Sequence, residues 1–198
     1  MTDPVAVTRA TYDTIAVEYE RRTRTPFAGL ADDVDAFASA LPVSALVADV
    51  GCGPGRDAAL LSERGPVVVR LDLSLAMLRM GDRSRAVQAD MRALPLRSDS
   101  LDGVWCQAAM LHVPLADAPL ALAEFGRVVR RDGVLYLAVA EGDGEGWQTD
   151  VHSGEHRWFA HHRVDSLSAL LAGAGFSVRD VTRRSSHRDW LVVRARRR

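Results

Sequence analysis

Three glycines, each separated from the next by one residue, lie directly after a short apolar stretch of this 198-residue chain. The apolar stretch is 46–50, the glycines are Gly51, Gly53 and Gly55, and a helical pattern follows at once. Glycine lets the backbone turn sharply and come close to a ligand, because no Cβ is in the way. The helix that follows points its free N–H groups back toward the turn. The pattern predicts a strand–turn–helix unit that holds a ligand at the turn.

A second apolar stretch, 67–71, ends in Asp72, twenty-one residues after Gly51. In a βαβ unit, a carboxylate at this place can accept hydrogen bonds from the hydroxyls of a ribose. A helix N-cap is the alternative role for Asp72, but Ser74 stands where it could cap the same helix. We therefore expect the chain to bind a nucleoside-containing cofactor.

The residues alone leave ATP, NAD and S-adenosylmethionine as cofactors to choose from. A phosphate-binding loop for ATP requires a lysine, and the sequence contains none. The NAD fingerprint is Gly-x-Gly-x-x-Gly, whereas here the third glycine comes one residue earlier and Asp49 precedes the turn. The spacing thus fits NAD poorly, and we expect Asp49 to hydrogen-bond the glycine turn from within.

Strand-like and helix-like patterns alternate along most of the chain. Two helices are predicted first, over 5–24 and 29–41. The strands predicted after them are 46–50, 67–72, 85–89, 102–107 and 133–140, and the helices are 55–64, 74–80, 116–130 and 164–173. Such alternation predicts a parallel sheet covered on both faces. The last two strands, 176–182 and 189–195, are joined by a short turn, so the final strand must run antiparallel.

Length and composition place the chain among ordinary globular proteins. A chain of 198 residues that is 47% hydrophobic predicts one domain with a substantial core. The N-terminus has no apolar signal segment, and no stretch is long and uncharged enough to cross a membrane. Two cysteines do not make a disulfide framework, and a net charge of −1 gives no drive toward nucleic acid. We expect a cytoplasmic protein, monomeric or homodimeric, without a membrane partner.

Six segments resemble, in order, the motifs of the class I S-adenosylmethionine-dependent methyltransferases. They are 12–19 (lid helix), 47–57 (glycine motif), 71–78 (acidic loop), 87–95 (adenine turn), 100–107 (fourth strand) and 127–135 (turn into the fifth strand). Residues 105–113 further resemble a group of small bacterial methyltransferases of unassigned substrate. The resemblance implies an α/β, Rossmann-like three-layer sandwich. Its sheet would have seven mostly parallel strands and an antiparallel last strand, with helices on both faces. One domain would span 1–198, with lid helices in 1–42 and the core in 43–198.

The resemblance also implies S-adenosylmethionine as the cofactor and S-adenosylhomocysteine as its product. Asp72 would bind the ribose, and Asp90 would bind the adenine amino group. Tyr12 and Tyr19 share one helical face, which would either close over the cofactor or be an ordinary core stripe. The expected cofactor-binding residues are Tyr12, Tyr19, Arg22, Gly51, Cys52, Gly53, Gly55, Arg56, Asp57, Asp72, Leu73, Met77, Asp90, Met91, Arg92 and Gln107.

His112 lies just past the fourth predicted strand, where a substrate of the family would enter. As a general base it would take a proton from the acceptor near neutral pH; its alternative role is to pack and hydrogen-bond a backbone carbonyl. We expect 147–162, rich in Trp, Phe and His, to form a substrate-facing flap. Its histidines match no established metal site, so no metal is expected. The acidic residues of 141–145 would be either solvated or in contact with a cationic substrate.

The predicted function is transfer of a methyl group from S-adenosylmethionine to an oxygen or nitrogen atom of a small molecule. Three alternatives remain. An RNA methyltransferase would present a contiguous basic surface, for which the C-terminal arginines are candidates. A cofactor-binding protein without turnover would lack an acceptor pocket beside the cofactor. An NAD oxidoreductase is disfavoured by the glycine spacing and by the antiparallel last strand.

Overall fold

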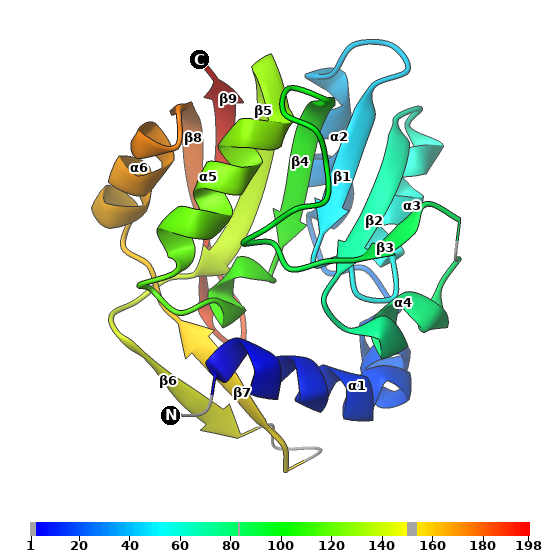
Figure 1. The fold of residues 1–198 in the computed structure, drawn as a ribbon, viewed down its shortest axis with the longest axis vertical. Coiled ribbons are helices and arrows are strands. Elements are labelled where there is room, and N and C mark those ends of the chain that lie inside the picture. Colours follow the sequence, from blue (N-terminus) through cyan, green and yellow to red (C-terminus); the bar gives the residue numbers. More distant parts are fainter. Residues whose placement is uncertain (1–2, 83, 150–153) are drawn as a thin grey trace.

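A seven-stranded sheet forms the centre of the computed structural model, which describes residues 3–82, 84–149 and 154–198 (Figure 1). The strand order is β3-β2-β1-β4-β5-β9-β8, and a separate two-stranded pair consists of β6 and β7. Part of the expected flap, 150–153, lies outside the described residues.

The helices and strands follow the predicted ranges closely. The helices are α1 (Pro4–Thr23), α2 (Leu30–Ser39), α3 (Arg56–Glu63), α4 (Leu75–Met80), η1 (Met110–His112, a 3-10 turn), α5 (Ala118–Val128) and α6 (Val164–Gly173). The strands are β1 (Leu46–Val50), β2 (Val67–Asp72), β3 (Ala86–Gln88), β4 (Leu101–Gln107), β5 (Val129–Ala140), β6 (Glu145–Thr149), β7 (His156–Ala160), β8 (Phe176–Ser185) and β9 (Asp189–Arg197).

The direction of the last strand distinguishes this sheet from a dinucleotide-binding one. Strands β1 to β5 pair in parallel, whereas β9 is antiparallel to both of its neighbours, β5 and β8. The dinucleotide-binding sheet has the parallel order 3-2-1-4-5-6. The predicted Rossmann-like sandwich with seven strands and an antiparallel last strand is therefore confirmed.

Helices cover both faces of the sheet and enclose two apolar cores. On one face, α5 and α6 contribute Phe125 and Leu167; on the other, α2 and α3 contribute Phe37 and Leu61. Burying one such side chain fully stabilises the fold by roughly 1.5–3 kcal/mol. No helix among the described residues is long and apolar enough to cross a membrane.

Helix α1 lies across the end of the sheet at which the parallel strands terminate (Figure 1). Asp3 caps it by accepting a hydrogen bond from the Val5 amide, and a proline occupies its first turn. Two threonines of α1 bind the neighbouring hairpin: Thr8 accepts from the Trp158 amide at 2.9 Å, and Thr11 donates to the His156 carbonyl at 2.7 Å. Helix α1 and the β6–β7 hairpin thus form one cover over the strand ends.

The β6–β7 hairpin is the element that the sequence patterns do not predict. Among the described residues its two strands pair with each other alone, and along β6 the side chains alternate between exposed and half-buried. Trp147 and Trp158 face each other across it with ring centroids 5.2 Å apart. With so few apolar positions, the alternation is too weak to recognise as a pair of strands. The expected substrate-facing flap therefore has regular structure at both of its described ends.

A buried ion-pair cluster joins α2 to the C-terminal strands. The Asp33 carboxylate is fully buried and pairs with Arg184 of β8 and Arg194 of β9. Tyr136 of β5 also donates a hydrogen bond to it at 2.9 Å. Burial opposes ionisation of this carboxyl, but the bonds from Arg184 and Tyr136 and the two positive charges lower its pKa overall. The cluster therefore stabilises the fold above the ordinary pKa of an aspartate and loses that contribution as the pH falls.

Replacing Asp33 with Ala should lower the free energy of unfolding at pH 7 by about 3 kcal/mol, because the partly buried Arg184 loses its counter-charge and Arg194 keeps only Asp180. Urea denaturation would measure the loss. Asp35→Ala is the matched control: Asp35 lies on the same helix but pairs with Arg64 at the surface, so its replacement should change stability by less than about 1 kcal/mol. Equal losses in the two variants would contradict the assignment.

Candidate functional site

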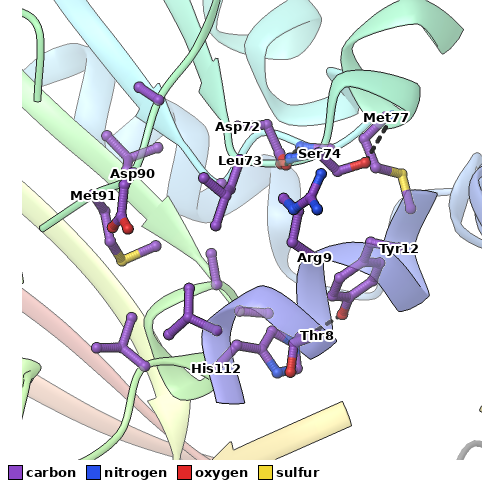
Figure 2. A pocket seen from close by; sticks show the side chains of 18 of the residues that line it. Thr8, Arg9, Tyr12, Asp72, Leu73, Ser74, Met77, Asp90, Met91 and His112 are labelled. Carbon is purple, nitrogen blue, oxygen red and sulfur yellow. Dashed lines mark hydrogen bonds between the residues drawn. The ribbon is translucent and has the colours of Figure 1, made fainter. Parts of the chain in front are cut away.

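Two adjoining cavities lie between the strand ends and the cover formed by α1 and the hairpin. The small pocket, about 110 Å³, reaches the ends of β2 and β3, and Figure 2 shows its lining. The large pocket, about 1060 Å³, extends under the hairpin to the β8–β9 turn. The residues that line both are Tyr12, Tyr19, Gly51, Gly53, Gln107, Ala108 and His112. Together the pockets are large enough for two small-molecule ligands.

The glycine turn has a backbone that other residues would not adopt without strain. Gly51 has φ +73°, and a Cβ built on it would stand 2.1 Å from the Ala109 Cβ. Gly53 also has a positive φ, +53°, and a Cβ built on it would lie 3.8 Å from the Tyr19 ring, an ordinary van der Waals distance. Because neither position carries a side chain, the turn forms a bare backbone floor beneath both pockets.

Asp72 holds this turn in place. Its Oδ2 accepts a hydrogen bond from the Gly53 amide at 2.8 Å, and its Oδ1 accepts from the Ser74 amide at 2.8 Å. Ser74, not Asp72, caps α4, since its hydroxyl accepts from the Met77 amide. Burial raises the pKa of Asp72, although the two amides act in the opposite direction. Each carboxylate oxygen keeps a further lone pair for a ligand hydroxyl at the pocket wall.

Asp90 lies across the small pocket from Asp72 (Figure 2). Its two oxygens accept hydrogen bonds from the backbone and guanidinium of Arg92, at 2.7–3.1 Å. Arg92 also pairs with Asp117 and lines neither pocket. Burial raises the pKa of Asp90, but the bonds from Arg92 outweigh it and leave the value lowered. Asp90 is thus a fixed carboxylate at the pocket wall, and Arg92 is its anchor.

The two lid tyrosines lie over both pockets. Their rings meet edge to face with centroids 5.4 Å apart. The Tyr12 hydroxyl is 2.7 Å from His112 Nε2 and accepts a hydrogen bond from Arg157 at 3.1 Å. Burial raises the pKa of both tyrosines, so both phenols are neutral at pH 7. Tyr12 therefore connects the lid to His112 of η1 and to Arg157 of the hairpin.

Both ring nitrogens of His112 are already hydrogen-bonded. Nδ1 is 2.6 Å from the carbonyl oxygen of Trp158, which can only accept, so Nδ1 carries the hydrogen and Nε2 accepts from Tyr12. Burial lowers the pKa of His112 to about 3, and the positive charges of Arg157 and Arg188 act in the same direction. The ring is neutral at pH 7 and has no free lone pair. This arrangement favours the carbonyl-bonded role over the general-base role.

Arginines and acids at one end of the large pocket come from the lid and the glycine turn. Arg56 donates to Asp57 at 2.7 Å and to the Thr23 carbonyl at 3.1 Å, and Arg22 lies nearby on the lid. Asp49 also lines this pocket, and its buried Oδ2 has no hydrogen-bond partner. The prediction that Asp49 bonds the glycine turn is not met at this oxygen. Its raised pKa results first from burial and then from the charge of Asp57.

Fifteen of the seventeen expected site residues line one pocket or the other. The exceptions are Arg92 and Gly55. Gly55 begins α3 with φ +94°, and a Cβ there would stand 2.5 Å from Arg70, so it serves local packing. Cys52 is a buried thiol, and burial raises its pKa above the ordinary value of a cysteine.

Sequence reasoning finds only part of the far wall of the large pocket, because the expected flap 147–162 contains Arg157 and Phe159 but not the residues of the β8–β9 turn and β9. This wall contains Arg157 and Phe159 of β7, Arg188 of the β8–β9 turn, and Trp190 of β9. These residues are far from the glycine motif along the chain and follow no local motif. Only the strand order and the hairpin bring them to the site.

Comparison with known proteins places this architecture in a family. A family profile described as a methyltransferase domain matches residues 48–137. Malonyl-[acyl-carrier protein] O-methyltransferase from Enterobacter lignolyticus is 34% identical over 152 residues, which cover 70% of this chain and 59% of that protein. The chain spans 37–59% of the length of the first four such relatives.

Solved structures agree with the fold. The 1,6-didemethyltoxoflavin-N1-methyltransferase of Burkholderia thailandensis, with bound 1,6-didemethyltoxoflavin and S-adenosylhomocysteine, is 25% identical with a TM-score of 0.77. The match covers 100% of this chain and 91% of that one. Magnesium protoporphyrin IX methyltransferase from Synechocystis PCC 6803 is similar in fold, with a TM-score of 0.78 at 18% identity over 100% of this chain and 99% of that one.

The sheet order and the glycine turn define a class I methyltransferase architecture, with its ligand pockets at the strand ends. Residues 48–137 match a methyltransferase domain, and the structure around them has the fold of the class I S-adenosylmethionine-dependent methyltransferases.

His112 should make the stability of the fold depend on pH. An unfolded histidine titrates near pH 6.5, whereas the folded ring has a pKa of about 3. Its contribution is therefore fully present above pH 6.5 and is lost as the pH falls below that value. Between pH 8 and pH 5, wild type should lose on the order of 1–2 kcal/mol more stability than His112→Gln. Urea denaturation at both pH values measures the difference. His156→Gln, which removes an exposed histidine, should follow wild type; identical losses in wild type and His112→Gln would contradict the prediction.

Proposed function

We propose that this chain binds S-adenosylmethionine and transfers its methyl group to an oxygen or nitrogen atom of a small-molecule acceptor. The observation that carries the proposal is the pair of pockets that meet above Gly51 and Gly53. The small pocket has carboxylates at its edge, which suit a nucleoside. The large pocket leaves space beyond it for a second ligand. The relatives named methyltransferases support the same reading.

The residues present fit the three parts of S-adenosylmethionine. In the small pocket, Asp72 has lone pairs left for the ribose hydroxyls, and Asp90, Leu73 and Met91 would surround the adenine. In the large pocket, the orphaned Asp49 oxygen would accept from an ammonium group, and Arg22 would face a carboxylate. The amino-acid end of the cofactor, which carries an ammonium and a carboxylate group, would therefore meet the carboxyl group of Asp49 and the guanidinium group of Arg22.

The bound cofactor supplies an electrophilic methyl group on a positively charged sulfur. The protein's own contribution is position and exclusion of water. Tyr12 and Tyr19 close the site from the lid, while Gln107, held by the Tyr136 hydroxyl at 2.8 Å, lines both pockets. In this proposal His112 is a positioning residue that fixes the Tyr12 hydroxyl; it is not the general base.

Two of the alternative functions receive less support. An RNA methyltransferase needs arginines free to face a phosphate backbone, but Arg194 pairs with Asp33 and Asp180, and Arg196 bonds the Asp132 carbonyl. A binding protein without turnover would have no acceptor space, and the large pocket offers that space. Both observations favour a small-molecule methyltransferase.

The cellular setting and the domain organisation are part of the same proposal. Cys52 and Cys106 are both free and buried, which suits a reducing, cytoplasmic environment. We treat 1–198 as one functional unit, in which 1–42 supplies the lid and 43–198 the core.

Calorimetric titration tests the cofactor. Wild type should bind S-adenosylmethionine and S-adenosylhomocysteine but not NAD. Asp72→Asn should weaken binding of both about tenfold to a hundredfold, because an amide NH₂ cannot accept from a hydroxyl or from the Gly53 and Ser74 amides. Asp99→Asn is the control, since Asp99 is exposed and lies outside both pockets. Binding of NAD alone would overturn the proposal.

A further inference from the structure

The far wall of the large pocket has a composition that the proposed function does not yet explain. Four side chains form it, and we call them the arginine–aromatic wall: Arg157, Phe159, Arg188 and Trp190. They stand beside His112 and Tyr12, and Arg157 donates to the Tyr12 hydroxyl at 3.1 Å. Phe159 lies 4.8 Å from the His112 ring, measured between ring centroids.

Aromatic rings hold both guanidinium groups of the wall. The Arg188 Cζ lies 4.1 Å from the Phe159 ring centroid and 5.8 Å from that of Trp190. Arg157 lies 5.4 Å from the same Phe159 ring and 5.5 Å from Tyr12. Stacking on a ring orients the planar guanidinium, and the edge N–H groups of Arg188 stay available to an acceptor. Arg157, by contrast, donates to the Tyr12 hydroxyl.

The charge of Arg188 has no carboxylate against it in the described structure. Its one hydrogen bond to a side chain goes to the neutral Gln148, at 3.3 Å. Half-burial lowers the pKa of Arg188, and the neighbouring charge of Arg157 lowers it further. Other arginines at this pocket differ, because Arg184 pairs with Asp33 and Arg56 with Asp57.

The acidic residues of 141–145 do not neutralise the charge of Arg188. Glu141 pairs with Arg183, and Asp143 pairs with Arg163. Glu145 accepts from the Leu115 amide at 2.6 Å. The acids of 141–145 thus bind the chain's own groups, and none of them lines either pocket.

From this arrangement we infer that the methyl acceptor is an organic anion with a flat apolar part. Its anionic group binds at Arg188, its flat part packs on Phe159 and Trp190, and its reacting oxygen arrives already deprotonated. The inference rests on the proposed function and specifies its substrate class. It also removes the need for a base at His112, whose ring nitrogens are both engaged.

The reaction then balances without any proton transfer. A lone pair of the anionic oxygen forms the new C–O bond, and the pair of the broken C–S bond stays on sulfur. One negative and one positive charge become two neutral products. Arg188 therefore binds the substrate anion and loses that attraction once the oxygen is methylated.

Benzoate and its uncharged analogue benzamide are suitable probes, since they share a flat ring and differ in charge. Each would be titrated calorimetrically into wild type, with and without S-adenosylhomocysteine. Wild type should bind benzoate at least tenfold more tightly than benzamide, and Arg188→Gln should remove that preference. Arg188→Lys should keep part of it, because the positive charge remains. Arg179→Gln, an exposed change of equal charge on β8 outside both pockets, should match wild type.

Three results would overturn the inference: no binding of benzoate at millimolar concentration, equal binding of the two probes, or an unchanged benzoate affinity in Arg188→Gln. Thermal melting of Arg188→Gln checks that the variant is folded. Arg188→Lys tests separately whether the positive charge at this position is what binds benzoate. Failure of the proposed function gives a different result. In that case S-adenosylhomocysteine does not bind, whatever the benzoate titrations show.

Discussion

The hydrogen bonds of one carboxylate, Asp72, hold the site together. Asp72 binds the Gly53 amide of the turn after β1 and the Ser74 amide at the start of α4. The Ser74 hydroxyl in turn donates to Asp13 of α1 at 2.6 Å. Three segments distant in the sequence thus share one short network. The floor of the pockets, the helix beside them and the lid above them all depend on it.

Much of this could be predicted from sequence, because the signals are local. The glycine turn, the strand ending in Asp72 and the final hairpin each follow from a few neighbouring residues. The arginine–aromatic wall is predicted only in part, since the expected flap 147–162 includes Arg157 and Phe159 but gives no partner for them. Arg157 is half-buried on a hairpin without a core of its own, and Arg188 reaches the site only because β9 lies beside β5. Their relation to the glycine turn is set by strand order, which a window of sequence does not contain.

His112 shows why residue type alone misleads about chemistry. A histidine at the end of the fourth strand suggests a proton acceptor, since imidazole titrates near neutral pH. Here the Trp158 carbonyl and the Tyr12 hydroxyl engage both nitrogens, and burial disfavours the charged ring. His112 therefore holds the lid and the hairpin in a fixed position relative to each other. Asp49 differs from His112. The sequence pattern predicts that its carboxylate hydrogen-bonds the glycine turn, but its buried Oδ2 has no hydrogen-bond partner.

The double attachment of α1 has a consequence for how ligands enter and leave. Its tyrosines border both pockets, and its threonines are bonded to the hairpin that roofs the larger one. A displacement of α1 wide enough to uncover the small pocket also disturbs the roof of the large one. Entry or release of one ligand through such a movement is therefore coupled to the opening of the other pocket.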